Sequence, residues 1–315
     1  MKAIVATPAG AALAEVPTPT PGPEEILVKV RAASLNRIDL ASRAAKDGKI
    51  IGMEYAGEVT AVGAQVRDRK VGDRVMCTGP AAFAEWAVTD SARSCPMPET
   101  LSFERGTGLT LALQTMHDAL VTRANMAQGE AVLIHGASAG VGLMGLQIAK
   151  LLGAGLVLGT STTAARVARL AEFGADRAIN ASDADWDAQV MQATGGKGVD
   201  VIIDQITGKD FKKTMQTAAV RGRIVNVGRL GGADGEFDFQ LHALRRISYI
   251  GVTFRTRSTD EIRALNHRML ADLAEPLRQG RLSLPLDMTF PFDQAAEALD
   301  RMAANAHFGK IVLVL

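Results

Sequence analysis

A turn of small residues between an apolar strand and an apolar helix is the strongest chemical signal in the sequence. It lies in the segment 132–145, which reads VLIHGASAGVGLMG. Such a turn presents backbone N–H groups and the positive end of a helix dipole to a pyrophosphate, and small residues allow the close approach. Gly140, Gly142 and Gly145 match GxGxxG, a weak pattern alone in a chain with 31 glycines but stronger between strand and helix. The segment predicts a dinucleotide-binding loop; the alternative is a tight turn in a ligand-free domain.

The segment after the next expected strand predicts which nicotinamide cofactor is bound. Recognition of the ribose 2′-OH of NAD needs an Asp or Glu about 20 residues beyond the glycines. The segment 159–166 has no acid; Thr160 and Ser161 bring hydroxyls, and Arg166 and Arg169 follow at helical spacing. Since arginine pairs with a 2′-phosphate and an acid would repel it, NADPH is favoured. The alternative is that both arginines belong to a solvated helix face.

The pattern of apolar runs predicts an α/β protein. Short runs separated by Gly, Pro and Asp predict a barrel-like β region with strands at 26–30, 55–62, 74–76 and 84–88. Alternating elements then predict βαβ units and a parallel sheet of about six strands, at 131–135, 156–159, 178–179, 199–204, 223–227 and 247–254. Their expected helices are 106–123, 140–152, 164–173, 186–193 and 211–218. The tail (helix 259–279, strand 284–290, helix 293–304, strand 310–314) is too small for a domain, so we expect it to pack on the β region.

Composition narrows the function classes. Lys and Arg number 35 against 34 for Asp and Glu, which leaves no excess of positive charge for a dedicated nucleic-acid binder. Cys77 and Cys95 lie far apart, which argues against a disulfide framework and a thiolate zinc site and fits a reducing compartment. No apolar stretch is long enough to span a bilayer, and Pro8 interrupts an N-terminal run too short for a signal peptide. We expect a soluble cytoplasmic protein.

Short motifs then recur from one end of the chain to the other. They are NRIDL (36–40), GMEYAGEV (52–59), VGDRV (71–75), FAEW (83–86), HGASAGVG (135–142), VNVG (225–228), GVTFRTR (251–257) and FGKIV (308–312). In this order they resemble the quinone oxidoreductase (zeta-crystallin-like) branch of the medium-chain dehydrogenase/reductase superfamily, over essentially the whole chain.

The resemblance implies an α/β fold in which a Rossmann doubly wound parallel sheet is inserted into a GroES-like β domain. Residues 1–112 with 258–315 would form the GroES-like catalytic domain and 113–257 the Rossmann NADPH-binding domain, with the active site in the cleft. The family's three fingerprint positions fall on Ala137, Ala139 and Gly142, so the literal GxGxxG is out of register. The residues expected along the cofactor are then Ser138, Ala139, Gly140, Val141, Gly142, Ile206, Thr207, Val227 and Gly228.

By the same resemblance, Asn36, Asp39 and Arg255 line the cleft near the nicotinamide ring. Asn36 can bond the substrate carbonyl or the ribose, or only stabilise a turn. Asp39 is favoured as the N-cap of the following helix over an acid catalyst, and Arg255 can instead be a structural ion-pair partner. His117 is a candidate proton donor at physiological pH, although a single His on an amphipathic helix is more often structural.

The resemblance also bears on metal use. Zinc members of the superfamily carry Cys where this chain has Asn36 and His where it has Met53. Neither an amide nor a thioether is a ligand that zinc prefers. Alcohol dehydrogenation depends on that Lewis acid, whereas a quinone or enone accepts hydride through its own conjugation. The sequence therefore predicts zinc independence.

Some positions depart from the family pattern and affect substrate identity. Relatives often have Tyr where this chain has Ala41 or Ser42, and again where it has Ala181, and the segment 43–52 is short. These changes predict a more open substrate site.

Together the observations predict an NADPH-dependent, zinc-independent reductase that transfers hydride to a quinone or similar conjugated carbonyl compound. One alternative is an alkenal, enone or enoyl reductase at the same site. Another is a non-catalytic NADPH-binding sensor or structural protein. The apolar strand expected at 247–254 would lie at the sheet edge, where an exposed edge invites pairing, so a homodimer through it is expected.

Overall fold

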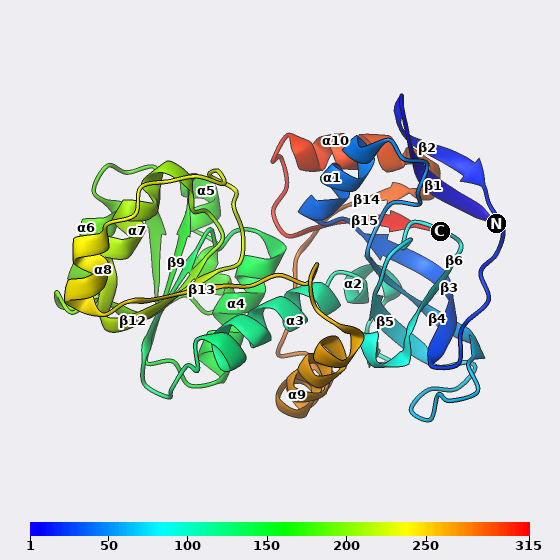
Figure 1. The fold of residues 1–315 in the computed structure, drawn as a ribbon, viewed down its shortest axis with the longest axis horizontal. Coiled ribbons are helices and arrows are strands. Elements are labelled where there is room, and N and C mark those ends of the chain that lie inside the picture. Colours follow the sequence, from blue (N-terminus) through cyan, green and yellow to red (C-terminus); the bar gives the residue numbers. More distant parts are fainter. The chain divides into compact units, whose positions relative to one another are not determined.

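A computed structural model describes all residues, 1–315, and divides them into two compact units. Unit 1 contains Met1–Leu111 and Thr259–Leu315, so it is built from both ends of the chain. Unit 2 is the continuous segment Ala112–Ser258. Figure 1 labels the elements of both units.

The framework of unit 1 is an open β-sheet of seven strands. Its order is β14-β15-β3-β4-β5-β7, and β6 pairs with β3 off this path. β1 and β2 form a separate hairpin. The elements of this unit are β1 (Lys2–Thr7), β2 (Gly10–Glu15), β3 (Glu25–Ser34), α1 (Arg37–Ala45), β4 (Glu54–Val62), β5 (Arg74–Thr78), β6 (Trp86–Asp90), η1 (Ser91–Arg93), β7 (Ser94–Pro96), α2 (Phe103–Gly106), α9 (Thr259–Arg278), β14 (Leu286–Pro291), η5 (Phe292–Gln294), α10 (Ala295–Ala303) and β15 (Lys310–Val314).

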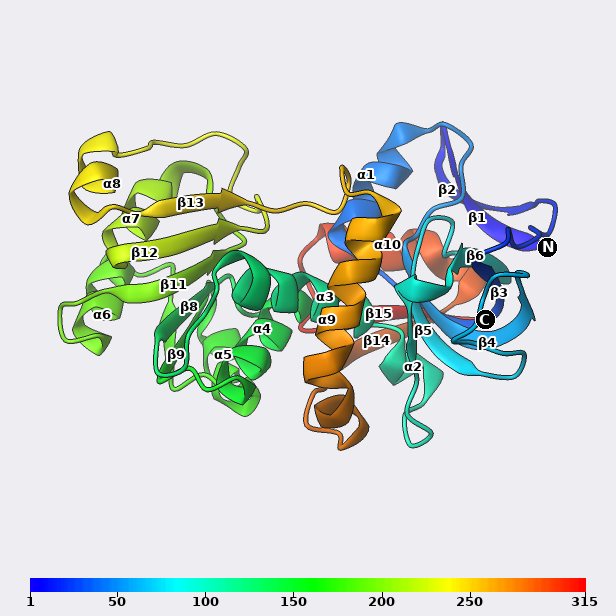
Figure 2. The ribbon, with the colours of Figure 1, turned by 60° about the horizontal axis from the view of Figure 1, so that its bottom comes forward.

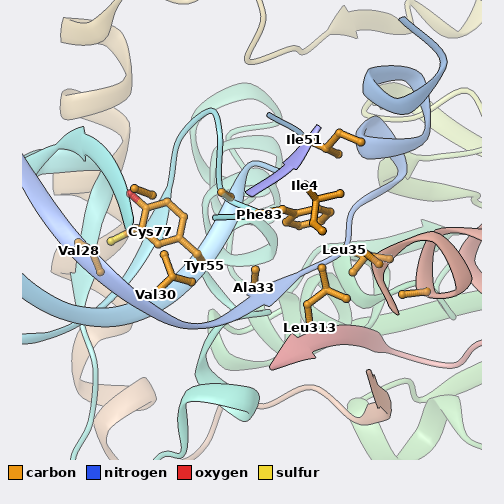
Figure 3. Packing of buried hydrophobic residues seen from close by; sticks show 14 of the residues in the cluster. Ile4, Val28, Val30, Ala33, Leu35, Ile51, Tyr55, Cys77, Phe83 and Leu313 are labelled. Carbon is orange, nitrogen blue, oxygen red and sulfur yellow. The ribbon is translucent and has the colours of Figure 1, made fainter. Parts of the chain in front are cut away.

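The core of unit 1 joins residues from the two ends of the chain. Tyr55 and Cys77 lie together on adjacent strands, and Phe83 lies beside Ile4, as Figure 3 shows. Leu313 of β15 belongs to the same cluster. β15 pairs antiparallel with β3, with Val312 opposite Ser34. The tail therefore packs on the β region, as its small size predicted.

Unit 2 is a doubly wound α/β domain. Its six strands are all parallel in the order β10-β9-β8-β11-β12-β13, and Figure 2 shows β8, β9, β11, β12 and β13 side by side. The helix α3 (Thr110–His117) begins in unit 1 and continues into unit 2. The other elements are η2 (Asp118–Arg123), β8 (Ala131–His135), α4 (Gly140–Leu151), β9 (Leu156–Ser161), α5 (Ala164–Val167), η3 (Leu170–Phe173), β10 (Arg177–Asn180), α6 (Trp186–Ala193), β11 (Val199–Asp204), η4 (Gly208–Asp210), α7 (Phe211–Gln216), β12 (Ala218–Asn226), α8 (Phe239–Arg245) and β13 (Ser248–Gly251).

Helices α6, α7 and α8 cover one face of this sheet (Figure 1). Trp186 of α6 and Phe211 of α7 pack there against Leu133, Leu158 and Ile202 of the strands. The central strands β8, β9 and β11 are buried along nearly their whole length, as parallel strands covered on both faces are. The expected Rossmann sheet of about six strands is thus confirmed. The structure contains no helix with the length and apolar character that a membrane span requires.

Most expected elements begin or end at other residues in the structure; two expected helices are divided and one expected strand is half as long. The helix expected at 106–123 is divided into α2, a turn, α3 and a π-helical turn, η2. The helix expected at 164–173 is divided into α5 and η3. The strand expected at 247–254 is only Ser248–Gly251. Before it, Ile247 N donates to His242 O and so belongs to the end of α8. After it, Arg257 Nε donates to Thr253 O and stabilises a turn.

Candidate functional site

The predicted phosphate loop, 138–142, lies between β8 and α4. It follows Gly136, which turns the chain at φ 85°, and Ala137 N donates to Thr160 O across 2.7 Å. Ala139 is the N-cap of α4 and makes no side-chain cap bond, so the N–H groups of the first helical turn face outward without a capping side chain. A Cβ on Gly142 would lie 2.7 Å from the Cα and O of Ala137. The loop therefore fits a pyrophosphate, and Gly142 is its close-packing glycine.

A buried histidine supports the entrance of this loop. His135 is 3% exposed, and its Nδ1 lies 2.8 Å from Thr160 Oγ1, which also accepts from Gly136 N at 3.0 Å. The Thr160 hydroxyl can donate to Nδ1 or accept from it, because Gly136 N–H uses only one of the two lone pairs of its oxygen. Either arrangement is open to a neutral imidazole. The ring stacks on Trp186 with centroids 4.7 Å apart. Burial lowers the pKa of His135 to about 4, in agreement with the neutral form.

The residues predicted to select the cofactor lie at the end of β9 and in α5. Thr160 is buried and uses its hydroxyl within the loop support. Ser161 Oγ donates to Ser138 Oγ at 2.9 Å, which ties β9 to the phosphate loop. Arg166 lies in α5 and is half-buried, whereas Arg169 pairs with Glu172 at 3.2 Å. Binding of a 2′-phosphate by Arg166 stays a prediction from the sequence.

Two further loops predicted to follow the cofactor are fastened to Asp204, the last residue of β11. Asp204 Oδ1 accepts from Ile206 N and Thr207 N at 2.8 and 3.0 Å. Its backbone oxygen accepts from Val227 N at 2.8 Å and Gly228 N at 3.2 Å. Burial raises the pKa of the Asp204 carboxyl. Thr207 has φ 53° and ψ −140°, a backbone conformation that a non-glycine residue adopts only where its surroundings hold it.

These loops meet at the point where ligands of such sheets bind. β8 lies between β9 and β11, so the chain order reverses between β8 and β11. Doubly wound sheets bind dinucleotides outside the carboxyl ends of the strands at this switch point. Gln205 Nε2 donates to Gly136 O at 3.0 Å and so joins the loops on either side of it.

A second polar cluster lies in unit 1, at the meeting of β3, β4 and β15. Glu54 is fully buried and Lys310 nearly so, and Lys310 Nζ lies 3.0 Å from Glu54 Oε2. Lys310 Nζ also donates to Asn36 Oδ1 at 2.9 Å, and Asn36 Nδ2 donates to Glu54 Oε2 at 2.9 Å. Ser34 Oγ donates to the same oxygen at 3.0 Å. We call Ser34, Asn36, Glu54 and Lys310 the buried polar network.

Asp39 lies next to the network in the first turn of α1. The N-cap of α1 is Asn36, and Asp39 occupies the third helical position, where its Oδ2 accepts from Asn36 N at 2.7 Å. The expectation that Asp39 is itself the N-cap was therefore wrong, because its carboxylate caps the helix start from inside the first turn. Burial raises the pKa of Asp39 to about 7, although Asn36 N–H and the Lys310 charge oppose the rise.

Arg255 and His117 are the remaining predicted residues, and both belong to unit 2. Arg255 is exposed beyond β13, and its backbone N donates to Thr253 Oγ1. The buried arginine of this segment is Arg257, which forms an ion pair with Asp118 of η2 at 2.5 Å. His117 is fully buried at the end of α3.

Comparisons with known proteins follow the same division of the chain. The model of the alcohol dehydrogenase GroES-like domain matches residues 22–126, and that of the zinc-binding dehydrogenases matches residues 140–271. Quinone oxidoreductase from Rattus norvegicus is 30% identical over 310 residues, which cover 96% of this chain and 92% of that protein. The chain belongs to the medium-chain dehydrogenase/reductase superfamily, among the relatives of quinone oxidoreductase.

The chain is also similar to a quinone oxidoreductase of known structure and to part of a polyketide synthase. The crystal structure of a quinone oxidoreductase from Pseudomonas syringae pv. Tomato DC3000 has a TM-score of 0.86 and 26% identity, and covers 100% of this chain and 99% of that one. A highly reducing polyketide synthase of Emericella nidulans is 28% identical over 96% of this chain, which spans 12% of that much longer protein. As a member of this superfamily, the protein binds a nicotinamide cofactor, and the loops at the carboxyl ends of β8, β9, β11 and β12 are where unit 2 can hold one.

The metal chemistry of this oxidoreductase depends on which side chains are present. Within residues 1–315, no three His, Cys, Asp or Glu side chains gather in a group that could hold a metal ion. Asn36 is engaged by Lys310 and Glu54, and Met53 precedes Glu54 at the start of β4. The donor set does not fit a resident zinc ion.

Sequence reasoning missed the two charged residues of the buried polar network. Glu54 and Lys310 are 256 positions apart, and each stands inside an apolar strand motif quoted for the family resemblance. One signal was available: an acid and a base, each placed in an otherwise apolar strand, must be paired when both strands are buried.

Proposed function

We propose that the protein is an NADPH-dependent reductase that transfers hydride to a quinone or a similar conjugated carbonyl compound. The observation that carries the proposal is the relation to a quinone oxidoreductase over 96% of the chain. The donor set of unit 1, with an amide at position 36 and a thioether at position 53 in place of zinc ligands, supports it. A conjugated acceptor needs no Lewis acid, because its own π system takes up the charge.

Several of the predicted residues have a distinct task in this proposal. Bound NADPH supplies the hydride. The loop 138–142 binds the pyrophosphate through its backbone, and Arg166 pairs with the 2′-phosphate. The loops fastened to Asp204 hold the cofactor on the sheet edge, which positions the donor carbon. Asp39 caps the start of α1 and so fixes the backbone at Asn36.

The test measures the oxidation of NADPH with each member of a substrate panel. Quinones, enals, enones and simple alcohols are compared under one set of conditions. We expect turnover of quinones or conjugated carbonyls and negligible NADP-dependent oxidation of ethanol-like alcohols. Robust alcohol oxidation without quinone or enone turnover refutes the proposal. NADPH binding without turnover of any acceptor favours the alternative of a non-catalytic NADPH-binding protein.

A second candidate is reduction of the conjugated double bond of an acyl chain at the same site. The similarity of nearly the whole chain to a segment of a polyketide synthase favours it. Acyl thioesters with a conjugated double bond belong in the same panel. A kcat/KM for such thioesters far above that for quinones would select this candidate.

Zinc independence is part of the proposal. We expect the purified protein to contain no stoichiometric zinc and to keep its activity after chelation, because Asn36 and Met53 cannot hold the metal. Metal analysis that finds about one zinc per chain would overturn this interpretation of the two positions.

A further inference from the structure

Glu54 collects more hydrogen bonds than any other side chain near the candidate site. Its Oε2 accepts from Ser34 Oγ, Asn36 Nδ2 and Lys310 Nζ at 3.0, 2.9 and 3.0 Å. Its Oε1 accepts from Leu111 N at 2.8 Å, in the first turn of α3. Glu54 is fully buried, so these four donors replace the water that a carboxylate would otherwise need.

The charges on either side of Asn36 fix which way its amide points. An ammonium group can only donate, so the atom of Asn36 that lies 2.9 Å from Lys310 Nζ must be the oxygen. A carboxylate can only accept, so the atom that lies 2.9 Å from Glu54 Oε2 must be the nitrogen. The reversed amide would place an NH₂ group against Lys310 and an oxygen against Glu54. The orientation of Asn36 is therefore dictated by its two neighbours.

This orientation decides what Asn36 has left to offer a ligand. One Nδ2 hydrogen is used by Glu54, and the other is directed toward Ser34 O at 3.4 Å. Oδ1 accepts one hydrogen bond, from Lys310, and an amide oxygen has a second lone pair. Asn36 is 8% exposed. Its amide therefore has one lone pair of Oδ1 left to accept a hydrogen bond from a ligand and no N–H left to donate.

The aliphatic part of the Lys310 side chain also packs against the backbone and helps to hold the network in place. A Cβ on Gly108 would lie 2.8 Å from Lys310 Cγ and 2.9 Å from Cε. The aliphatic stem thus lies flat on the backbone at Gly108, and two hydrogen bonds hold its ammonium end. Lys310 has little freedom to turn away from Asn36.

We propose that Glu54 and Lys310 are positioning residues that lock the Asn36 carboxamide so that its oxygen accepts a hydrogen bond from a hydroxyl group of a bound ligand. The inference rests on the proposed function and on the family resemblance, which implies that Asn36 lies in the active site. It excludes the role in which Asn36 donates to the carbonyl of the acceptor. A ribose hydroxyl of the cofactor and a hydroxyl of the hydroquinone product have the required chemistry, and separate measurements distinguish them.

The first experiment separates acceptor from donor at position 36. Asn36→Asp keeps the oxygen that faces Lys310, while its second oxygen replaces the amide nitrogen 2.9 Å from Glu54 Oε2 and must carry a proton, which leaves no donor for a ligand; Asn36→Leu removes both functions. NADPH affinity is measured by fluorescence titration, and the affinity for a hydroquinone by product inhibition. We expect Asn36→Asp to stay within a few-fold of the parent for the ligand concerned and Asn36→Leu to lose about tenfold or more. Equal losses in both variants, or no loss in either, overturn the acceptor role.

The second experiment tests the positioning. Glu54→Gln places an NH₂ group among three donors, and Lys310→Met removes the donor that holds Asn36 Oδ1. We expect each to weaken the same ligand as Asn36→Leu does. The control is Glu58→Gln on the same strand, which removes the exposed pair with Arg31 and should change nothing.

The double variant guards against misfolding. Glu54→Gln with Lys310→Met leaves no unpaired buried charge, so it should fold even if a single variant does not, and the Asn36 amide is then free to turn. We expect native-like thermal unfolding with weakened binding. A folded double variant that binds NADPH and hydroquinone like the parent overturns the inference. Because NADPH titration needs no turnover, a failed quinone assay with altered NADPH affinity refutes the proposed function alone.

Discussion

Replacement of Gly142 by alanine tests the register of the phosphate loop. The new Cβ would lie 2.7 Å from Ala137 Cα, 2.7 Å from its O and 2.8 Å from its C. Carbon atoms in contact are about 3.5–4.0 Å apart, and all three neighbours are backbone, so the start of α4 and the turn at Ala137 must separate by several tenths of an ångström. Overpacking of this kind costs about 1–3 kcal/mol. The shift also disturbs the amides that face the pyrophosphate, and each charge-assisted hydrogen bond lost is worth about 1.5–3 kcal/mol.

The expected result for Gly142→Ala is a loss of about ten- to a hundredfold in NADPH affinity, with a lower Tm. Fluorescence titration and thermal unfolding measure the two effects. Gly145→Ala is the matched control, since it lies one turn further along the same helix and its nearest neighbour is the flexible Met116 side chain, Sδ at 2.9 Å. We expect near-parental affinity from the control. If Gly145→Ala loses NADPH affinity as Gly142→Ala does, the literal GxGxxG, which contains both glycines, is the true fingerprint and our assignment of the loop is wrong.

Three further predictions address the cofactor, acid stability and assembly. NADPH should bind more tightly than NADH, and Arg166→Ala should remove about tenfold or more of that preference; equal affinities in the parent contradict this. The folded pKa of His135, about 4, lies below its ordinary 6.5, so the unfolded state takes up a proton first and stability falls as the pH drops from 6.5 to 4. This loss should reach about 2 kcal/mol at pH 5 in denaturant titrations, and an unchanged slope in His135→Gln would show that another group is responsible. β13 is an edge strand with Tyr249 42% exposed, so we propose a homodimer through it, and a monomer in light scattering at micromolar concentration would be the failure.

Much of unit 2 could be predicted because its signals are local. The expected ranges 131–135, 186–193 and 199–204 coincide with β8, α6 and β11, since each is an apolar run bounded by turn residues. The phosphate loop followed from the same local contrast between strand, small residues and helix.

The interrupted helix at 106–123 shows where local signals fail. Its apolar periodicity continues past Gly108, but the chain turns there and the Lys310 stem lies against that glycine. No periodicity near position 108 contains information about a residue so far along the chain. The short β13 has a similar origin, because its end is set by a turn that Arg257 fastens.

The sequence selected candidate site residues but not all of the contacts that they make. Asn36 and Asp39 were selected, but the direction of the Asn36 amide depends on Glu54 and Lys310, which pattern alone does not pair. The cap at α1 shows the same limit. Asn36 and Asp39 both suit a helix start, and only the backbone angles decide that the first is the cap and the second reaches back to it.

The strand pairing of β15 has a consequence for the order of folding during synthesis. Unit 2 is one continuous segment, so its sheet can form as soon as residue 258 has left the ribosome. Unit 1 cannot complete its sheet until β15 has been synthesised, because β15 pairs with β3. Lys310, the partner of Glu54, is the first residue of β15. Until then the Glu54 carboxylate, which is buried in the folded unit, lacks the Lys310 cation, and the edge of β3 that pairs with β15 is open. A ribosome that stalls just before the codons of β15 should therefore leave a chain with a folded dinucleotide unit and an aggregation-prone N-terminal half.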